Sequence, residues 1–158
     1  MDVYGTAGND RLKGTAEDDL LDGGAGTDRL RGSFGNDTFS FHWLSGPFNS
    51  HVPDTGIGKG QRDIIQDFLD GDLIQLSGYN PVGASTVVVV PEFLGTEDFH
   101  DGWGLQVRVI TEGNHDVIQI SSQASLPKIP TAPPPANVIA EIQVAGHHSW
   151  SIADFLLL

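Results

Sequence analysis

Aspartate recurs every nine residues near the N-terminus of this 158-residue chain. The recurring residues are Asp10, Asp19, Asp28 and Asp37. Each is the sixth residue of one of four contiguous copies, GTAGNDRLK, GTAEDDLLD, GGAGTDRLR and GSFGNDTFS, which span residues 5–40. Carboxylates combined with turn carbonyls make the hard oxygen ligand set that calcium prefers. The spacing therefore predicts calcium sites shared between copies, and it excludes an EF-hand, whose loop spacing and closing Glu are absent.

The rest of each copy indicates how these carboxylates are positioned. Every copy opens with Gly, which permits a tight turn, and its eighth residue is large and apolar. The eighth residues are Leu12, Leu21, Leu30 and Phe39. The last three residues then read as a short strand whose middle side chain points inward. Two copies complete one coil, so each turn stacks on the turn two copies later, about 4.8 Å away. Such stacking makes Asp10 face Asp28 and Asp19 face Asp37, and a cation between each pair relieves the repulsion.

Several segments resemble the RTX, or hemolysin-type, family of calcium-binding β-roll modules. The four nonapeptides carry the resemblance most strongly, and weaker landmarks follow them. These landmarks are Asp37–Phe41, Asp63–Phe68, Asp72–Ser77, Glu141–Gly146 and Ala153–Leu158. Similar segments occur in the C-terminal modules of serralysin-type proteases and in the R-modules of alginate epimerases. The resemblance covers most of the chain.

This resemblance implies a set of metal ligands and a binding stoichiometry of two to four calcium ions. The implied first site joins Thr6, Gly8 and Asp10 to Gly23, Ala25 and Asp28. The second joins Thr15, Glu17 and Asp19 to Gly32, Phe34 and Asp37. A third joins Ser33, Gly35 and Asp37 to Asp63, which leaves the third turn without a later partner. Glu17 departs from the family pattern, which has Gly at that place.

The predicted fold is all-β: a right-handed parallel β-roll of about two coils, closed by a small, mostly antiparallel β cap. We expect a single domain over residues 1–158. Residues 5–40 form the repeats, and residues 41–158 form the cap and a tail that resembles a C-terminal secretion signal. A proline-rich loop is expected at residues 122–136, where five prolines gather.

The composition of the chain limits which binding partners and which cellular location we expect. Acidic residues outnumber basic ones 21 to 8, and the net charge of -13 argues against nucleic acid or anionic membranes as partners. The chain has no cysteine, so disulfides cannot stabilise it. No apolar run is long enough to span a membrane. The family resemblance implies a secreted, extracellular module, exported by a type I secretion apparatus that reads the C-terminus, and we expect a monomer.

The sequence offers little support for catalysis. The six histidines are scattered, no H-E-x-x-H spacing occurs, and there is no cysteine nucleophile. We therefore expect a non-catalytic accessory module whose parent protein can itself be an enzyme. An enzymatic role for the module is the less favoured alternative.

One basic cluster stands out on this acidic chain. The seventh and ninth places of the repeat point outward, and in copies one and three they are Arg11, Lys13, Arg29 and Arg31. Because these copies stack on the same sheet, the four side chains form a two-by-two patch. Two interpretations remain open. The calcium-site carboxylates neutralise the patch, or it binds an acidic polysaccharide such as alginate, as a carbohydrate-binding R-module would.

Overall fold

The computed structural model describes residues 1–45, 51–77, 92–97, 104–123 and 138–157. Its strands are β1 (Asp2–Tyr4), β2 (Arg11–Lys13), β3 (Leu20–Asp22), β4 (Arg29–Arg31), β5 (Thr38–Ser45), β6 (His51–Pro53), β7 (Asp63–Ile65), β8 (Leu73–Ser77), β9 (Glu92–Gly95), β10 (Gly104–Glu112), β11 (His115–Gln123), β12 (Val138–Ala145) and β13 (Phe155–Leu157). A three-residue 3₁₀ helix, η2 (Ile152–Asp154), precedes β13. No helix among these residues has the length and apolar character needed to span a membrane.

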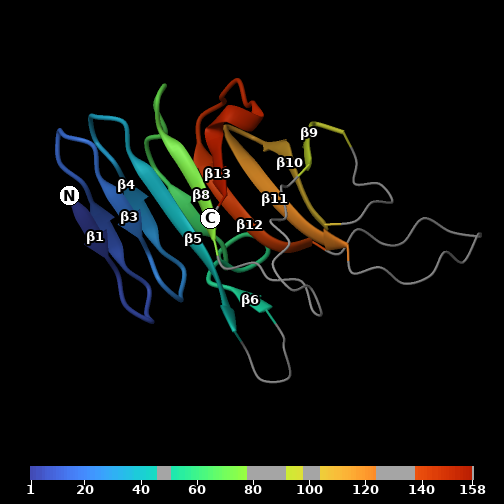
Figure 1. The fold of residues 1–158 in the computed structure, drawn as a ribbon, viewed down its shortest axis with the longest axis horizontal. Helices are drawn as coiled ribbons and strands as arrows, with labels where there is room; N and C mark the ends of the chain where they lie inside the picture. The colour runs from blue at the N-terminus through green and yellow to red at the C-terminus, as the bar shows by residue number, and fades with distance from the viewer. Residues whose placement is uncertain (46–50, 78–91, 98–103, 124–137, 158) are drawn as a thin grey trace, which may run out of the picture.

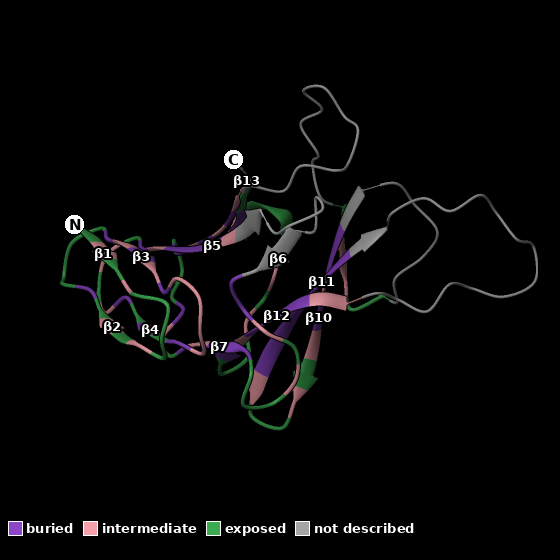
Figure 2. Cartoon of the chain, turned by 90° about the horizontal axis from the view of Figure 1, so that it is seen from below, coloured by how far each residue is buried: buried purple, intermediate pink, exposed green. Residues whose placement is uncertain are grey.

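The repeat strands alternate between two facing sheets, as Figures 1 and 2 show. One sheet has the order β1-β3-β5-β8-β13, and the other has the order β2-β4-β7-β12-β11-β10-β9. Pairing within the repeats is parallel and in register, with Leu12 opposite Leu30 and Leu21 opposite Phe39. The predicted all-β fold with a parallel β-roll is therefore confirmed.

The eighth residue of each copy fills the interior between the two sheets. Leu21, Leu30 and Phe39 are fully buried, and Leu12 packs against them at the N-terminal end. Ile65 of β7 and Ile74 of β8 continue the same row and are also fully buried. Burial of this single row explains why the strands need only three residues each, because one inward side chain per strand suffices.

The roll is longer than the two coils expected from the sequence. β7 pairs in parallel with β4, and β8 pairs in parallel with β5, so a third coil follows the four repeats. Its sequence, GKGQRDIIQ at residues 58–66 and DFLDGDLIQ at residues 67–75, keeps Asp at the sixth place and Ile at the eighth. These two copies were not recognised because they lack several of the glycines and because residues 41–57 interrupt the period.

The cap is joined to the roll by strand pairing. β10 and β11 form an antiparallel hairpin, β11 pairs with β12, and β12 then pairs in parallel with β7 of the roll. On the other sheet β13 pairs in parallel with β8, so residues 152–157 form η2 followed by a strand. Most of the proline-rich segment, residues 124–137, lies outside the described residues.

Candidate metal centre

The aspartate side chains connect stacked turns in a regular way along one edge of the roll. Asp28 Oδ1 accepts a hydrogen bond from the backbone N–H of Asp10 at 2.7 Å. One coil further on, Asp63 Oδ1 accepts from the N–H of Asp28 at 2.6 Å. Each carboxylate thus holds the preceding turn of its stack. We call the series Asp10, Asp28 and Asp63 the first aspartate ladder.

The opposite edge has the same arrangement. Asp37 Oδ1 accepts from the N–H of Asp19 at 2.9 Å, and Asp72 Oδ1 accepts from the N–H of Asp37 at 2.8 Å. We call Asp19, Asp37 and Asp72 the second aspartate ladder. The sequence separations are equal on the two edges, with 18 residues in the first step and 35 in the second. The whole array therefore follows one repeating geometry.

The surroundings of four ladder carboxylates disfavour their charge, namely those of Asp28, Asp37, Asp63 and Asp72. Asp28 is fully buried, and Asp37 and Asp63 are almost fully buried. The pKa of Asp63 is raised to about 8, mainly by burial and also by the nearby charge of Asp28. Burial also raises the pKa of Asp28 and of Asp37, where neighbouring ladder carboxylates add to the effect. A divalent cation would remove this penalty by compensating the negative charges.

The turns approach one another so closely that glycine is required at the contacts. A β-carbon on Gly26 would lie 2.6 Å from the carbonyl oxygen of Gly8, and one on Gly35 would lie 2.6 Å from that of Glu17. Gly26 and Gly35 also adopt positive φ angles of 148° and 113°. Backbone carbonyls and carboxylates of two turns therefore meet on each edge.

The turns that carry the residues of the first two implied sites stack on one another in the order that the resemblance implies. On one edge the first turn stacks on the third, and on the other edge the second stacks on the fourth. Thr6 and Thr15 each donate both a backbone N–H and a hydroxyl to the aspartate of their own turn, Asp10 and Asp19 respectively. Ala25 lies between the stacked Gly24 and Gly26, and Gly23, Gly32 and Phe34 lie in the same two stacks. Glu17 does not disrupt its stack, because its carbonyl still meets Gly35.

The third implied site is wrong in its pairing. Asp63 does not close the fourth turn: it receives the N–H of Asp28 and closes the third turn, for which no partner was expected. The fourth turn, which contains Ser33, Gly35 and Asp37, is closed by Asp72 instead. The reason is that β7 returns to the sheet of β4, whereas β8 joins the sheet of β5.

Asp67 also contacts the fourth turn and was missed. Its carboxylate accepts the N–H groups of Gly32 at 2.9 Å and Ser33 at 3.1 Å, and it pairs with Arg31 at 3.2 Å. The signal that could have found Asp67 and Asp72 is the nonapeptide at residues 67–75, which places them at its first and sixth positions.

One buried carboxylate oxygen of the ladders, Asp28 Oδ2, is a candidate cation ligand. Asp28 Oδ2 is buried and has no hydrogen-bond partner among the described residues. Asp19 Oδ1 likewise accepts no hydrogen bond from the described part of the chain, but it lies 2.7 Å from the ammonium group of Met1. Buried carboxylate oxygens are rarely left without a partner. The ladder oxygens and the turn carbonyls therefore fit calcium in both charge and chemistry.

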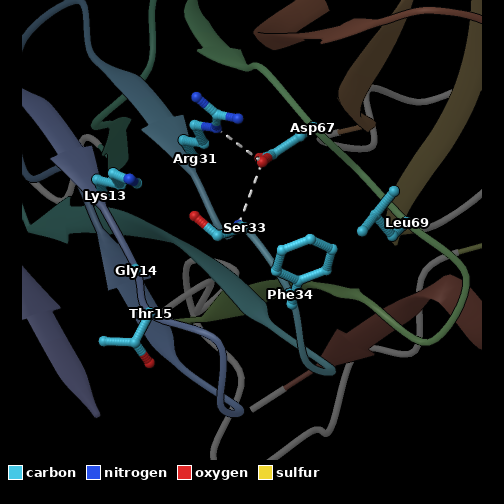
Figure 3. Close-up of a pocket in the computed structure, with 8 residues that line it drawn as sticks. All are labelled: Lys13, Gly14, Thr15, Arg31, Ser33, Phe34, Asp67 and Leu69. Carbon is cyan, nitrogen blue, oxygen red and sulfur yellow. Dashed lines mark hydrogen bonds and ion pairs between the residues drawn. The ribbon is translucent and has the colours of Figure 1, made fainter.

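The basic residues form the expected two-by-two array on the outer face of β2 and β4. Arg11 is opposite Arg29, and Lys13 is opposite Arg31. The patch borders a surface groove of about 480 Å³, whose lining includes Lys13, Arg31, Phe34 and Leu69 (Figure 3). Phe34 is 70% exposed at its rim. Arg31 is already paired with Asp67, so its charge is partly compensated.

Comparison with known proteins identifies the repeat segment. Residues 4–39 match the RTX calcium-binding nonapeptide repeat family, in four copies. RTX nonapeptide repeats bind calcium, so the resemblance recognised in the sequence is confirmed for this segment. Comparison with curated proteins finds no significant match.

A solved structure is also similar in arrangement. It is the solution structure of the AlgE6R3 subunit of mannuronan C5-epimerase from Azotobacter vinelandii. The two chains are 20% identical with a TM-score of 0.46, and the match covers 96% of this chain and 80% of that one. This likeness does not by itself assign a ligand to the present chain.

Proposed function

We propose that the chain is a non-catalytic module whose β-roll folds when calcium binds between the stacked turns. The observation that carries the proposal is the buried carboxylate of Asp28, whose Oδ1 holds the preceding turn while its Oδ2 has no partner in the described structure. In this role the ladder carboxylates and turn carbonyls provide the ligands, and the cation neutralises charges that the fold brings together.

The ladder geometry supports two to four ions. Two turn-on-turn contacts occur on each edge, namely the first turn with the third, the third with the fifth, the second with the fourth, and the fourth with the sixth. Asp28 and Asp37 take part in two contacts each, whereas Asp10 takes part in one. This difference provides a test that depends on the ladders rather than on overall acidity.

The test is to count bound calcium in ladder variants by atomic absorption after desalting. We expect Asp28→Asn to lose more calcium than Asp10→Asn, because Asp28 serves two contacts. Asp2→Asn is the matched control, since Asp2 is exposed on the edge strand β1 and belongs to neither ladder. Equal losses in the two ladder variants, or an equal loss in Asp2→Asn, would contradict the proposal.

Calcium-dependent folding suits a module that crosses membranes unfolded and folds outside the cell. We therefore propose that the module is secreted by a type I apparatus and works extracellularly, where calcium reaches millimolar concentrations. A calcium-binding module needs no catalytic group of its own, and the parent protein can supply one. Export of a reporter fused to residues 1–158 from cells that carry or lack the apparatus would test the secretion part.

A second candidate function is binding of an acidic polysaccharide such as alginate. It is favoured by the in-register array of Arg11, Lys13, Arg29 and Arg31, because four cations gathered on a chain of net charge -13 form a local site for a polyanion. The adjoining groove adds an exposed aromatic ring, that of Phe34, against which a sugar face can pack (Figure 3).

The carbohydrate proposal is tested by adding oligouronates to calcium-loaded protein and following its amide resonances. We expect shifts confined to β2, β4 and the groove, weaker at high salt because exposed charges are screened over about 8 Å at physiological ionic strength. Arg11→Gln combined with Arg29→Gln should reduce binding of the oligouronate, because it removes two of the four cations. It should leave the calcium sites unchanged, because neither residue is a proposed calcium ligand. Absence of shifts in the wild type would remove this function and leave the calcium-dependent folding role intact.

A further inference from the structure

Three metal-ligating side chains that belong to neither aspartate ladder meet on the outer face of the roll. Asp22 ends β3, His42 lies on the neighbouring β5, and Asp54 follows β6, which pairs with the outer half of β5. His42 Nδ1 is 3.5 Å from Asp22 Oδ2 and 3.8 Å from Asp54 Oδ2. One ligand atom from each of the three residues lies within 4.8 Å of the other two.

Asp54 provides an independent indication that a cation belongs there. Its side chain is 3% exposed, and its Oδ1 has no hydrogen-bond partner among the described residues. The pKa of Asp54 is raised to about 7, mainly by burial and also by the nearby charge of Asp22. A carboxylate held in this way, beside a second carboxylate, lacks a compensating positive charge.

The backbone holds these groups firmly in place. Asp54 Oδ2 accepts the backbone N–H of His42 at 2.7 Å, and the N–H of Asp54 donates to the carbonyl of His42 at 3.0 Å. Asp22 Oδ1 accepts the N–H of Gly24 at 3.0 Å, which leaves Oδ2 directed at His42. The ligand atoms are therefore positioned by strand pairing and hydrogen bonds before any ion arrives.

The donor set selects the kind of metal. Calcium takes oxygen ligands, whereas an imidazole nitrogen combined with carboxylates suits zinc and related divalent transition metals. Tetrahedral zinc with bonds of 2.0–2.2 Å places its ligand atoms about 3.4 Å apart. The separations of 3.5 and 3.8 Å from His42 Nδ1 are close to this value.

We propose that Asp22, His42 and Asp54 form a site for a divalent transition metal of the zinc class, distinct from the calcium sites. Three protein ligands leave a fourth position for water. The ligands come from β3, β5 and the segment after β6. The metal therefore holds the segment that links the fourth turn to the fifth against the outer face of the roll. It therefore stabilises the return of the chain to β7, which carries Asp63 of the first aspartate ladder.

The test is calorimetric titration of zinc into tag-free protein kept in excess calcium, which occupies the oxygen sites. We expect one tightly bound equivalent of zinc in the wild type. His42→Ala should abolish this binding, and Asp54→Asn should weaken it at least tenfold. His147→Ala is the matched control, because His147 also lies beside a carboxylate, Asp116, at 3.0 Å but pairs with no second acidic side chain in the described part of the chain. It should bind zinc as the wild type does.

A direct measurement on the wild type keeps the proposal falsifiable if a variant fails to fold. Nitrogen NMR of the histidine rings should show zinc on Nδ1 of His42 and the proton on Nε2. No change in the His42 ring on adding one equivalent of zinc would overturn the proposal and leave an ordinary polar contact of His42 with Asp22 and Asp54. Undiminished zinc binding by a folded His42→Ala variant would overturn it as well.

Discussion

Asp28 and Asp37 each connect three turns of one stack. Asp28 connects the first, third and fifth turns, and Asp37 connects the second, fourth and sixth. Their Oδ1 atoms accept an N–H from the preceding coil, and their own N–H groups donate to the aspartate of the following coil. This double role explains why Asp occupies the sixth place: the side chain is short enough to stay at the edge and long enough to reach the next turn. Asn could accept the same hydrogen bond, but it would not supply the charge that a cation requires.

Ser33 adopts a backbone conformation that is better suited to glycine. Its φ angle is +86°, and the equivalent residue of the third turn, Gly24, has a φ angle of +74°. Left-handed backbone costs a non-glycine residue about 1–2 kcal/mol. Ser33→Gly also removes a buried hydroxyl that has no partner among the described residues. We expect this substitution to raise the free energy of unfolding in calcium by about 1 kcal/mol, measured by urea denaturation.

Thr15→Gly provides the contrast, because Thr15 occupies the same place in the second turn but donates its hydroxyl to Asp19 at 2.9 Å. That substitution should lower stability. A destabilised Ser33→Gly variant would contradict the assignment of strain to this turn.

Low pH should partly stabilise the fold of the calcium-free protein. The folded-state pKa of Asp63, about 8, lies above its usual value of 3.8 because of burial. Below 3.8 the resulting stabilisation of the calcium-free fold is fully present, and it is lost as the pH rises through about 8. We therefore expect metal-stripped protein to have more strand signal in circular dichroism at pH 5.5 than at pH 8.5. An equal or weaker strand signal at pH 5.5 would contradict the argument that burial disfavours the charge of Asp63.

At the level of elements, the sequence predicted the repeated part of the roll correctly. A strict nine-residue period determines both the strand spacing and which side chain is buried, so the pairing of β2 with β4 and of β3 with β5 could be derived. The fifth and sixth turns could not, because several of their glycines are replaced and residues 41–57 interrupt the period. For the same reason the stacking of the first turn on the third and of the second on the fourth was predicted, whereas Asp63 was given the wrong partner. Pairing of the cap with β7 depends on contacts distant in sequence.

β7 joins the roll to the cap, and Ile65, its last residue, points inward. Ile65 is fully buried, and it lies opposite Leu30 of the roll and opposite Val144 of the cap. Ile65→Ala should lower the free energy of unfolding in calcium by about 2–5 kcal/mol, as found for large-to-small changes in cores. Ile64→Ala is the matched control, because Ile64 faces outward on the same strand and should cost less. Equal losses in urea denaturation would show that β7 is not the junction.

At the level of the whole molecule, the fold concentrates negative charge in its own interior. The chain carries a net charge of -13, and its ladders place carboxylates on adjacent turns. Short strands cannot persist alone against this repulsion. Calcium at ten times its dissociation constant contributes roughly 1.4 kcal/mol per site, so several sites supply a large share of the stability of a small domain.

The most direct test of calcium-dependent folding is an amide NMR spectrum of the repeats at pH 7.5, recorded first in excess EGTA and then in calcium. The account predicts collapsed, poorly dispersed resonances for residues 5–40 in EGTA and a dispersed set in calcium, because the turns stack only when the ladder charges are compensated. Equally dispersed repeat resonances under both conditions would contradict it, since the roll would then fold without the metal.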